Sequence, residues 1–314
     1  MLDVTVGIMS YNRPQFLDEA IASVLSQTVT PKKIIIFDNG SEIEVLSVAQ
    51  KYFSDGVEWV GSPKNNGFFW NFERAFELCT TKYLMLLHDD DRLLKNFLER
   101  QMELLTSNPD IVALSCNGYL ISAEGAQYGV TLFPFNASSS LECFRTPGQV
   151  GIKYASNSCV PLSPTIYNTK ALLNSKIKEE FGKVADAVFF CELAQSGTVA
   201  VNNFPLYEMR FHLEQDSQHI PFHLSQLLED FFWNVSCKDI TETKLLRGQL
   251  IRQHSIRNLR LMVERIKILD FQAIPSLLLD KRFNWISALR STIRYCLGDC
   301  MLKLGNSKKS FKIL

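Results

Sequence analysis

Short apolar runs alternate with segments of helical periodicity over the first 120 residues of the chain. The apolar runs cover residues 4–9, 34–37, 57–60, 83–87 and 111–115. Between the first two runs, Leu17, Ile21 and Val24 recur at three or four residues, which predicts a helix from Pro14 to about Gln27. Similar segments predict helices near 43–53, 71–79 and 93–107. Apolar strands separated by helices are typical of a mostly parallel sheet that is buried on both faces.

The pattern changes twice beyond this segment. Between residues 118 and 182, Gly, Ser, Pro and Asn are frequent and the periodicity is poor, which predicts loops with short strands. Beyond residue 222 the spacing becomes helical, over about 224–235, 241–269 and 285–304. We therefore expect an α/β domain over 1–217, followed by a helical region over 218–314.

The charge of the chain is divided between two unlike parts. In total, 33 Lys and Arg balance 33 Asp and Glu. Residues 241–314 hold 15 Lys and Arg against 5 Asp and Glu, a net charge of +10, so the first 240 residues carry 18 minus 28, or −10. This asymmetry suggests a basic module that faces something anionic, such as a membrane surface. The alternative is a basic helical bundle that packs against the core or against a second subunit, as in a homo-oligomer.

The sequence also indicates the cellular compartment in which the protein works. No apolar run approaches the roughly 18 residues that span a bilayer, and the first four residues lack the features of a signal peptide. We therefore expect a cytoplasmic protein, with the inner face of the cell membrane as the surface that the basic helices would contact. The eight cysteines stand mostly alone in apolar surroundings, which predicts reduced core residues, and Cys296 and Cys300 share a helix face.

Polar clusters follow three of the apolar runs. They are Ser10-Tyr11-Asn12-Arg13, Asp38-Asn39-Gly40-Ser41 and Asp89-Asp90-Asp91. Ligands bind beyond the carboxyl ends of the strands in an open parallel sheet, so these clusters mark a candidate site. Three adjacent carboxylates repel one another unless a cation or strong donors offset the charge, and a divalent ion with phosphate oxygens is a common solution. The alternative for the aspartates is a solvated acidic turn or a helix cap.

Four motifs in this order resemble the family 2 glycosyltransferases of the GT-A fold. They are Val6-Gly7-Ile8-Met9-Ser10-Tyr11-Asn12-Arg13, Ile36-Phe37-Asp38-Asn39-Gly40-Ser41, Asn65-Asn66-Gly67 and Leu86-Leu87-His88-Asp89-Asp90-Asp91. The resemblance is close over about 120 residues and looser to about residue 217. It implies a Rossmann-like GT-A domain over 1–217, in which 1–120 binds the nucleotide sugar and 121–217 binds the acceptor. The implied activity is an inverting transfer from a nucleotide diphosphate sugar, with Mn²⁺ or Mg²⁺ as cofactor.

The resemblance also implies roles for individual residues. The nucleotide-binding residues would be Ser10, Tyr11, Arg13, Asp38, Asn66, Arg74 and Asp89. Asp38 would accept a hydrogen bond from the base and Arg74 would reach the diphosphate. Ordinary packing for Tyr11 and a surface position for Arg74 are the alternatives.

The metal ligands would be Asp90, Asp91 and His212, and a structural role is the alternative for His212. Asp89 would contact the ribose or the metal. His88 stands where many members of the family have an acidic residue, so which two of the three aspartates form the metal-binding pair stays open.

An inverting transfer also requires a base that removes the proton of the acceptor hydroxyl. Asp186 resembles the aspartate of the family's Glu-Asp pair at the start of a helix, although Ala185 replaces the glutamate. A helix N-cap is the alternative for Asp186. The motifs that follow it, ending in Met209-Arg210-Phe211-His212, reproduce the order of the family and favour the base.

We therefore expect a glycosyltransferase that adds one sugar to a glycan. The donor would be a UDP-sugar, or a thymidine nucleotide sugar, and the acceptor a lipid-linked oligosaccharide for bacterial surface polysaccharide, O-antigen lipopolysaccharide or capsule. A sugar-phosphate nucleotidylyltransferase is one alternative, but it would carry a Gly-rich, Arg-containing loop after the first strand. A sugar-nucleotide-binding module without activity is the other, and Asp38, the three adjacent aspartates and Asp186 argue against it. No motif favours dinucleotides, and we expect no nucleic acid partner.

Overall fold

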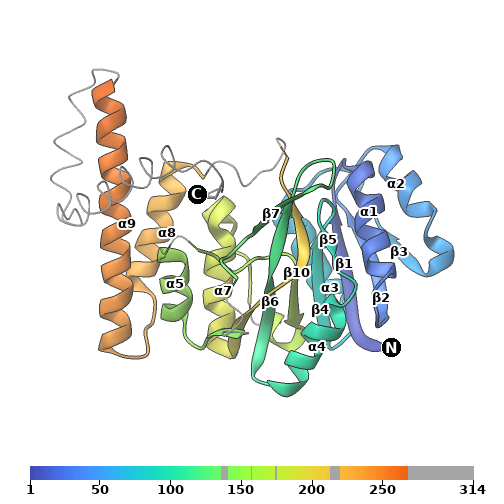
Figure 1. Cartoon of the computed structure of the whole chain (residues 1–314), viewed down its shortest axis with the longest axis horizontal. Helices are drawn as coiled ribbons and strands as arrows, with labels where there is room; N and C mark the ends of the chain where they lie inside the picture. Colours follow the sequence, from blue (N-terminus) through green and yellow to red (C-terminus); the bar gives the residue numbers. More distant parts are fainter. Residues whose placement is uncertain (136–140, 157, 174, 213–219, 268–314) are drawn as a thin grey trace.

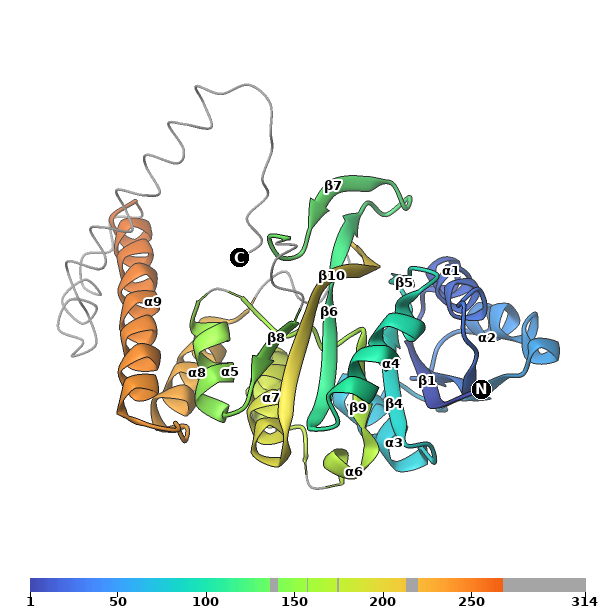
Figure 2. The same cartoon turned by 60° about the horizontal axis from the view of Figure 1, so that its bottom comes forward.

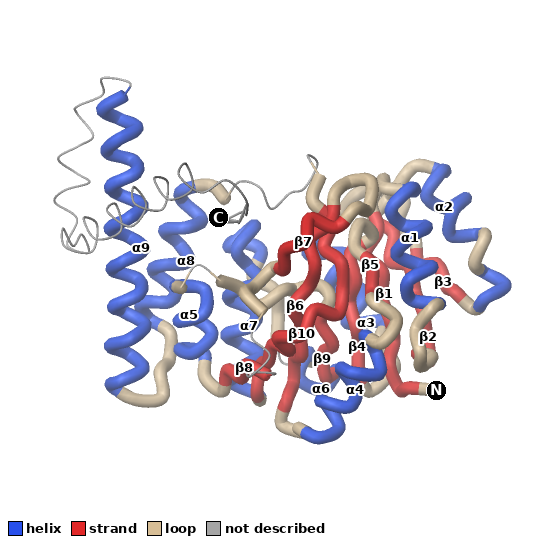
Figure 3. Tube along the Cα trace, in the orientation of Figure 1, coloured by secondary structure: helices blue, strands red, loops and turns tan. Residues whose placement is uncertain are grey.

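The computed structural model describes residues 1–135, 141–156, 158–173, 175–212 and 220–267, with side chains described as far as residue 258. Within these residues, one sheet of ten strands has helices on both faces (Figures 1 and 3). The strands are β1 (Leu2–Ser10), β2 (Pro31–Asp38), β3 (Val57–Val60), β4 (Tyr83–His88), β5 (Arg92–Leu93), β6 (Ile111–Ile121), β7 (Gln127–Thr131), β8 (Leu141–Phe144), β9 (Thr165–Asn168) and β10 (Thr198–Arg210). The helices are α1 (Pro14–Leu25), α2 (Ile43–Gln50), α3 (Phe68–Leu78), α4 (Phe97–Ser107), α5 (Pro147–Ala155), α6 (Thr169–Leu172), α7 (Ala185–Ser196), α8 (Phe222–Asn234) and α9 (Ile240–Lys267), with the short 3-10 helices η1 (Phe53–Asp55) and η2 (Glu179–Val184).

The strand order is β3-β2-β1-β4-β9-β6-β10-β5, with β7 paired to β6 and β8 paired to β10. Six strands, β1, β2, β3, β4, β6 and β10, run in one direction, and the other four run against them. The prediction of a mostly parallel α/β sheet is confirmed. β1 lies between β2 and β4 and is buried from Val4 to Ser10, which explains its continuous apolar run.

Two hydrophobic clusters fill the two faces of the sheet. One contains side chains of α1, α2 and α4, and the other contains side chains of α3, α5, α7, α8 and α9. Along β1, Val6 and Ile8 belong to the first cluster and Met9 belongs to the second. Successive side chains of a strand point to opposite faces, so one short run supplies both cores.

Several elements differ in extent from the sequence prediction, and three of the differences have a clear local reason. α3 begins at Phe68 rather than Asn71, directly after Gly67, whose φ of 90° favours glycine. α4 begins four residues later than predicted because the residues before it pair with β10 as the short strand β5. β6 continues as far as Ile121, since β10 pairs with it in parallel to that residue.

The segment 118–182 is more regular than its composition predicts. The short strands β7, β8 and β9 agree with the prediction of short strands in this segment, but the helices α5 and α6 were not predicted. β10 is a 13-residue strand for which no prediction was made. Together, these elements complete the second half of the sheet and one of its helical layers (Figure 2).

The C-terminal helices pack on the layer formed by α5 and α7 (Figure 1). α8 and α9 confirm the helical spacing predicted over 224–235 and 241–269. Leu246 and Leu250 of α9 are buried in the same cluster as the side chains of α5 and α7, so the chain on either side of residue 217 shares a core. The division into two regions at that residue stays a prediction.

Some sequence predictions concern other parts of the chain. The helical pattern over 285–304, with Cys296 and Cys300, lies outside the described residues. The six cysteines that the structure does describe are all unpaired. Among the helices described, none combines the length and the apolar character needed to cross a membrane.

Candidate active site

The three polar clusters meet at one edge of the sheet, beyond the carboxyl ends of β1, β2 and β4. In the pairing register, Ser10 of β1 lies beside Asp38 of β2, and Met9 lies beside His88 of β4. The backbone N–H of Tyr11 donates to Asp89 Oδ2 at 2.9 Å, which ties the loop after β1 to the loop after β4. The parallel strands thus bring together residues that are up to 78 positions apart in sequence.

Asp38 is buried at this edge, and only one of its two carboxylate oxygens is hydrogen-bonded within the described structure. Its Oδ2 accepts the N–H groups of Gly40 and Ser41, each at 3.1 Å. Its Oδ1 is buried and has no hydrogen-bond partner in the described structure, and the same holds for the Ser10 hydroxyl next to it. Leaving a buried carboxylate oxygen unpaired costs about 1–3 kcal/mol, so this pair of atoms is suited to a ligand that brings its own donor.

The loop after β2 is held in place by the Asn65-Asn66-Gly67 motif. The Asn39 amide nitrogen donates to Asn65 Oδ1 at 2.9 Å and to the Gly67 carbonyl at 3.0 Å, and its Oδ1 accepts the N–H of Asn66 at 3.1 Å. Gly40 has a φ of 80°, and a Cβ there would lie 2.2 Å from the Lys64 carbonyl carbon, so only glycine fits. The Asn66 side chain donates within its own loop, to Ser62 Oγ at 2.8 Å.

Arg74 of α3 reaches backbone carbonyls around the same loop. Its guanidinium donates to the carbonyls of Val60 at 2.7 Å, Asp38 at 2.8 Å and Gly61 at 3.3 Å. The guanidinium also lies over the Trp70 ring, 4.5 Å from its centroid. These contacts tie the ends of β2 and β3 together, and the contact with a diphosphate stays a prediction.

The three aspartates after β4 are buried around Arg13 and His212. Arg13 Nη1 lies 3.2 Å from Asp89 Oδ1 and 3.1 Å from Asp90 Oδ2, and His212 Nε2 lies 3.0 Å from Asp90 Oδ2. The sequence predicts all four side chains for the site, and the fold brings them within hydrogen-bonding distance. Tyr11 lies at the rim, with its ring partly exposed.

The acidic cluster carries more negative charge than its protein partners offset. Burial, with the charge of Asp90, raises the pKa of Asp89 to about 7, and the same two causes raise the pKa of Asp91 well above its usual range. Burial also acts to raise the pKa of Asp90, but His88, Arg13 and His212 lower it below its usual value. A bound cation would favour the ionised form of all three carboxyl groups.

The donor set fits a divalent metal ion. His88, Asp90 and Asp91 each offer one ligand atom, and these atoms lie within 4.8 Å of one another. Two carboxylates and one imidazole suit Mn²⁺, whereas Mg²⁺ prefers oxygen ligands alone. His88 belongs to this group, whereas His212 lies against Asp90 through a hydrogen bond, so the metal-ligand role predicted for His212 stays a prediction.

Arg210 is a site residue whose function the sequence analysis did not find. Its side chain is fully buried, and its Nε donates to the Asp90 carbonyl at 2.9 Å, while its backbone N–H donates to Asp91 Oδ1 at 3.0 Å. The guanidinium also pairs with Glu19 of α1 at 2.7 Å and lies over the Phe16 ring. Arg210 therefore fixes the acidic loop to α1 and to the end of β10, and the only signal in the sequence was its place beside His212.

Asp186 lies in the first turn of α7, away from the helix cap. The N-cap is Val184, so the cap position offered as the alternative belongs to another residue. The Tyr154 hydroxyl of α5 donates to Asp186 Oδ2 at 2.9 Å. Burial raises the pKa of Asp186 to about 6, and the hydrogen bond from Tyr154 limits this rise. A carboxyl group with this pKa is mostly ionised at neutral pH and can accept a proton.

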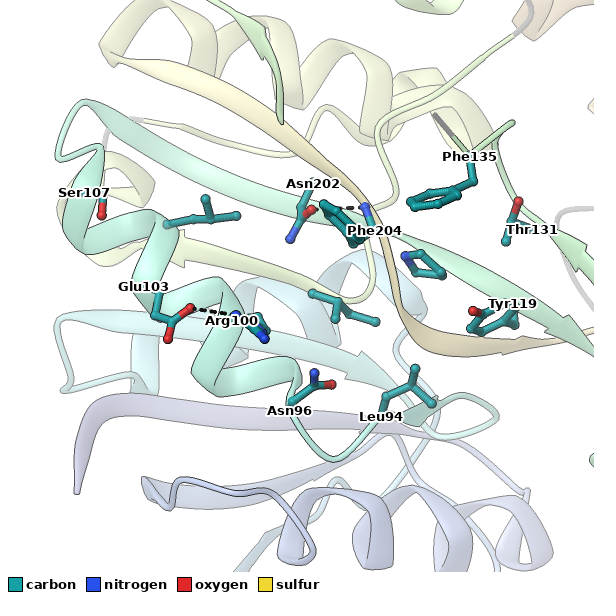
Figure 4. Close-up of a pocket in the computed structure, with 13 residues that line it drawn as sticks. Leu94, Asn96, Arg100, Glu103, Ser107, Tyr119, Thr131, Phe135, Asn202 and Phe204 are labelled. Atoms are coloured by element: carbon teal, nitrogen blue, oxygen red, sulfur yellow. Dashed lines mark hydrogen bonds and ion pairs between the residues drawn. The ribbon is translucent and has the colours of Figure 1, made fainter. Parts of the chain in front are cut away.

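A separate cavity of about 790 Å³ lies between α4 and the strands β6 and β10 (Figure 4). The rings of Phe135 and Phe204 meet edge to face on one side, with centroids 5.3 Å apart, and Arg100 and Glu103 of α4 lie on another. None of the predicted site residues lines this cavity. It is therefore distinct from the site at the strand ends.

Comparison with known proteins assigns the fold and the family. The model of the family described as Glycosyl transferase family 2 matches residues 5–153, which include all three polar clusters. The resemblance to family 2 glycosyltransferases that the motifs carry is therefore confirmed over these residues. The matched range ends within α5, so Asp186 and His212 lie beyond it.

Relatives and solved structures agree with this assignment. The chain is 28% identical over 123 residues to the putative teichuronic acid biosynthesis glycosyltransferase TuaG of Bacillus subtilis, covering 38% of this chain and 48% of that protein. It is 26% identical over 124 residues to a chondroitin synthase of Escherichia coli, covering 39% of this chain and 18% of that protein. The match thus spans less than half of either relative. The crystal structure of S. aureus TarS 1–349 in complex with UDP-GlcNAc has a TM-score of 0.64 at 15% identity, over 81% of this chain and 73% of that one. The GT-A fold is therefore confirmed.

Proposed function

We propose that this protein transfers one sugar from a UDP-sugar to a glycan acceptor, with inversion at the anomeric carbon. The observation that carries the proposal is the buried, unpartnered Oδ1 of Asp38 at the same strand edge as an acidic cluster that fits a metal ion. A nucleotide diphosphate sugar has the complementary groups, since its base carries an imide N–H and its diphosphate binds divalent ions. The UDP-GlcNAc complex of the TarS fragment supports the choice of donor.

We assign the base of the donor to the pocket between β1 and β2. Asp38 Oδ1 accepts the imide N–H of uracil, and the exposed ring of Tyr11 offers a surface on which the base can stack. The Ser10 hydroxyl is a second polar group in this pocket. Thymine presents the same imide, so a thymidine donor fits these residues as well.

The first prediction tests this pocket through Asp38→Asn. The asparagine oxygen is needed for the N–H groups of Gly40 and Ser41, so its NH₂ group would face the imide N–H of the base. Two opposed donors cost at least about tenfold in affinity for UDP. Isothermal titration of UDP measures the effect, with the exposed Asp55→Asn as the control. Equal affinity in Asp38→Asn and the wild-type protein would show that the base binds elsewhere.

We propose that His88, Asp90 and Asp91 hold the divalent ion, Mn²⁺ or Mg²⁺. When bound, the ion supplies positive charge that stabilises the departing diphosphate. Arg13 and His212 hold Asp90 in position through its Oδ2. Arg210 holds the backbone of the same loop through the Asp90 carbonyl.

The transfer itself is a single displacement with Asp186 as the base. The acceptor hydroxyl oxygen forms a bond to the anomeric carbon as the bond from that carbon to the β-phosphate oxygen breaks. The hydroxyl proton passes to the Asp186 carboxylate, and UDP leaves with the electron pair of the broken bond. The pKa of about 6 suits this role, because the base is ionised at pH 7 yet basic enough to bind the proton.

For the acceptor, we propose a growing surface polysaccharide on a lipid carrier. The Bacillus subtilis relative is named for teichuronic acid biosynthesis, and the Escherichia coli relative is named as a chondroitin synthase. Both names refer to polysaccharides. Such a carrier lies in a membrane. Binding of the basic C-terminal region to anionic lipids would therefore bring the enzyme to its acceptor.

The second prediction concerns that region. Residues 268–314 hold eight Lys and Arg against three Asp, a net charge of +5, and each basic residue near an anionic membrane contributes about 1 kcal/mol. The full chain should therefore float with phosphatidylglycerol vesicles at low salt better than a chain that ends at Lys267. At high salt both should float less. If both float equally, or if full-length protein instead dimerises through this region on size exclusion, the basic surface serves another role.

A further inference from the structure

We propose that Tyr154 is a positioning residue for Asp186, and that α9 sets its position by holding α5 at both ends. The inference deepens the proposed function, because it rests on Asp186 as the base. Tyr154, Asp186 and α9 lie beyond the family match, which ends at residue 153.

The contact between Tyr154 and Asp186 fixes the orientation of the carboxylate. Tyr154 Oη lies 2.9 Å from Asp186 Oδ2 and 3.2 Å from the Val160 carbonyl. A phenol has one hydrogen, and the ionised carboxylate is the stronger acceptor of the two. Burial, with the charge of Asp186, raises the pKa of Tyr154 well above its usual value, so the hydroxyl stays protonated and donates. With Oδ2 held, the direction of Oδ1 is also set.

The other titratable groups around Asp186 are neutral at pH 7. They are Cys159 on the loop after α5, Tyr167 of β9 and Cys191 of α7. Burial raises the pKa of Cys159 to about 12, and it raises the pKa values of Tyr167 and Cys191 well above their usual ranges. These groups therefore do not hold the carboxylate ionised by charge. Hydrogen bonds do so, first the one from Tyr154 and then those from the backbone N–H groups of Ala187 and Asp186.

The N-terminus of α5 is held by α9 through a side-chain relay. Thr146, the N-cap of α5, accepts the N–H of Gln149 at 3.1 Å and donates its own hydroxyl to Glu242 of α9 at 2.5 Å. The Glu242 carboxylate comes so close that a Cβ on Gly148 would lie 2.2 Å from its oxygen. The negative charge at the helix N-terminus is favourable because the first N–H groups of a helix point toward it.

The other end of α5 and its middle are held by the same helix. Gln253 of α9 donates to the Tyr154 carbonyl at 3.2 Å. Between the two ends, Gly151 lets Leu246 pack closely, since a Cβ there would lie 3.2 Å from that side chain. Figure 1 shows α9 running beside α8 and α5, with α7 on the inner side. Movement of α5 along α7 would break these contacts, so the place of the Tyr154 hydroxyl depends on α9.

The experiment is Tyr154→Phe, with Tyr167→Phe as a matched control. Tyr167 is also a buried tyrosine near Asp186, but its hydroxyl donates to the Leu162 carbonyl, so the control makes the same chemical change without removing a hydrogen bond to Asp186. The release of UDP from UDP-N-acetylglucosamine and from UDP-glucose with Mn²⁺ is measured from pH 5 to pH 8. For Tyr154→Phe we expect kcat at pH 7 to fall about tenfold with an unchanged KM for the donor. The acidic limb of the kcat profile should move to higher pH, because the lost hydrogen bond had lowered the pKa of Asp186.

A second set of variants tests the part played by α9. Gln253→Ala and Glu242→Gln, each in the full chain, should shift the acidic limb in the same direction as Tyr154→Phe, by a smaller amount. A wild-type kcat and pH profile in Tyr154→Phe would overturn the inference, and wild-type profiles in both α9 variants would overturn its second part. If Tyr154→Phe melts well below the control, the α9 variants decide the question.

Failure of the inference can be told apart from failure of the proposed function. If Asp186→Asn retains UDP release, the base has been misassigned and the role of Tyr154 falls with it. If Asp186→Asn loses UDP release while Tyr154→Phe keeps it, Asp186 remains the base and the positioning role alone is wrong.

Discussion

Asp186→Asn is expected to lower sugar transfer by about a thousandfold while leaving the affinity for the UDP-sugar unchanged. General base catalysis contributes about 10² to 10⁴ in rate, and an amide cannot accept the proton. The Tyr154 hydroxyl can still donate to the asparagine oxygen, so the local structure is kept. Turnover and donor affinity are measured on the same preparation, with Glu192→Gln on the same helix as the control. Loss of donor binding would instead make Asp186 a structural residue of the donor pocket.

The same variant should be more stable than the wild-type protein at high pH. The pKa of Asp186 is raised from 3.8 to about 6 in the folded state, mainly by burial, so the folded protein binds this proton more tightly than the unfolded chain does. The ionised form therefore destabilises the fold, fully above about pH 6 and not at all below about pH 4. The difference corresponds to about 3 kcal/mol at most. Thermal melts of Asp186→Asn and wild type should diverge at pH 8 and converge at pH 4, and parallel curves would contradict this reasoning.

Asp90→Asn is expected to lower Mn²⁺ affinity and to lower transfer by at least about a hundredfold. The change removes one of the two carboxylates in the metal-competent group, and it also removes the shared partner of Arg13 and His212. We expect the fold to persist, because the substitution relieves the repulsion between Asp90 and its neighbours Asp89 and Asp91. Titration with Mn²⁺, turnover and circular dichroism measure the three effects. The exposed Asp3→Asn is the control. Unchanged turnover in Asp90→Asn would show that Asp90 is not a ligand of the metal.

The part of the site that could be predicted from the sequence is the part formed at strand ends. Ser10, Asp38 and Asp89 follow apolar runs that are buried on both faces, and parallel strands bring such ends to one edge. The family motifs then gave these residues their expected roles. The prediction that these ends meet at one edge is confirmed, because both the strands and their polar ends are local features of the chain, and the roles of the residues stay predictions.

The elements that the sequence did not predict depend on contacts between distant residues. α5 contains Gly148 and Gly151, which weaken a helix by about 1 kcal/mol each, and it forms because those glycines let α9 approach. β10 has register shifts between Asn202 and Tyr207, so no simple alternation marks it as a strand. β5 is only two residues long and is defined by its partner.

The missed role of Arg210 has the same origin. Its partners are Glu19, Asp90 and Ala123, which lie 87 to 191 positions away along the chain. A fully buried arginine is costly unless several acceptors surround it, but nothing near Arg210 in the sequence identifies them. His88 was noted for standing at an acidic position, and the structure places it with Asp90 and Asp91 in the metal-competent group.

The contacts between α9 and α5 set a lower limit on the length of an active recombinant fragment. A fragment that stops at residue 217, where the family resemblance fades, would lack Glu242 and Gln253 and would expose the face of α5 that Leu246 covers. Fragments for expression or crystallisation should extend through α9. Likewise, a chimera that exchanges acceptor specificity between relatives should carry α5, α7 and α9 as one unit, since α7 carries Asp186, α5 supplies the Tyr154 hydroxyl to it, and α9 holds α5.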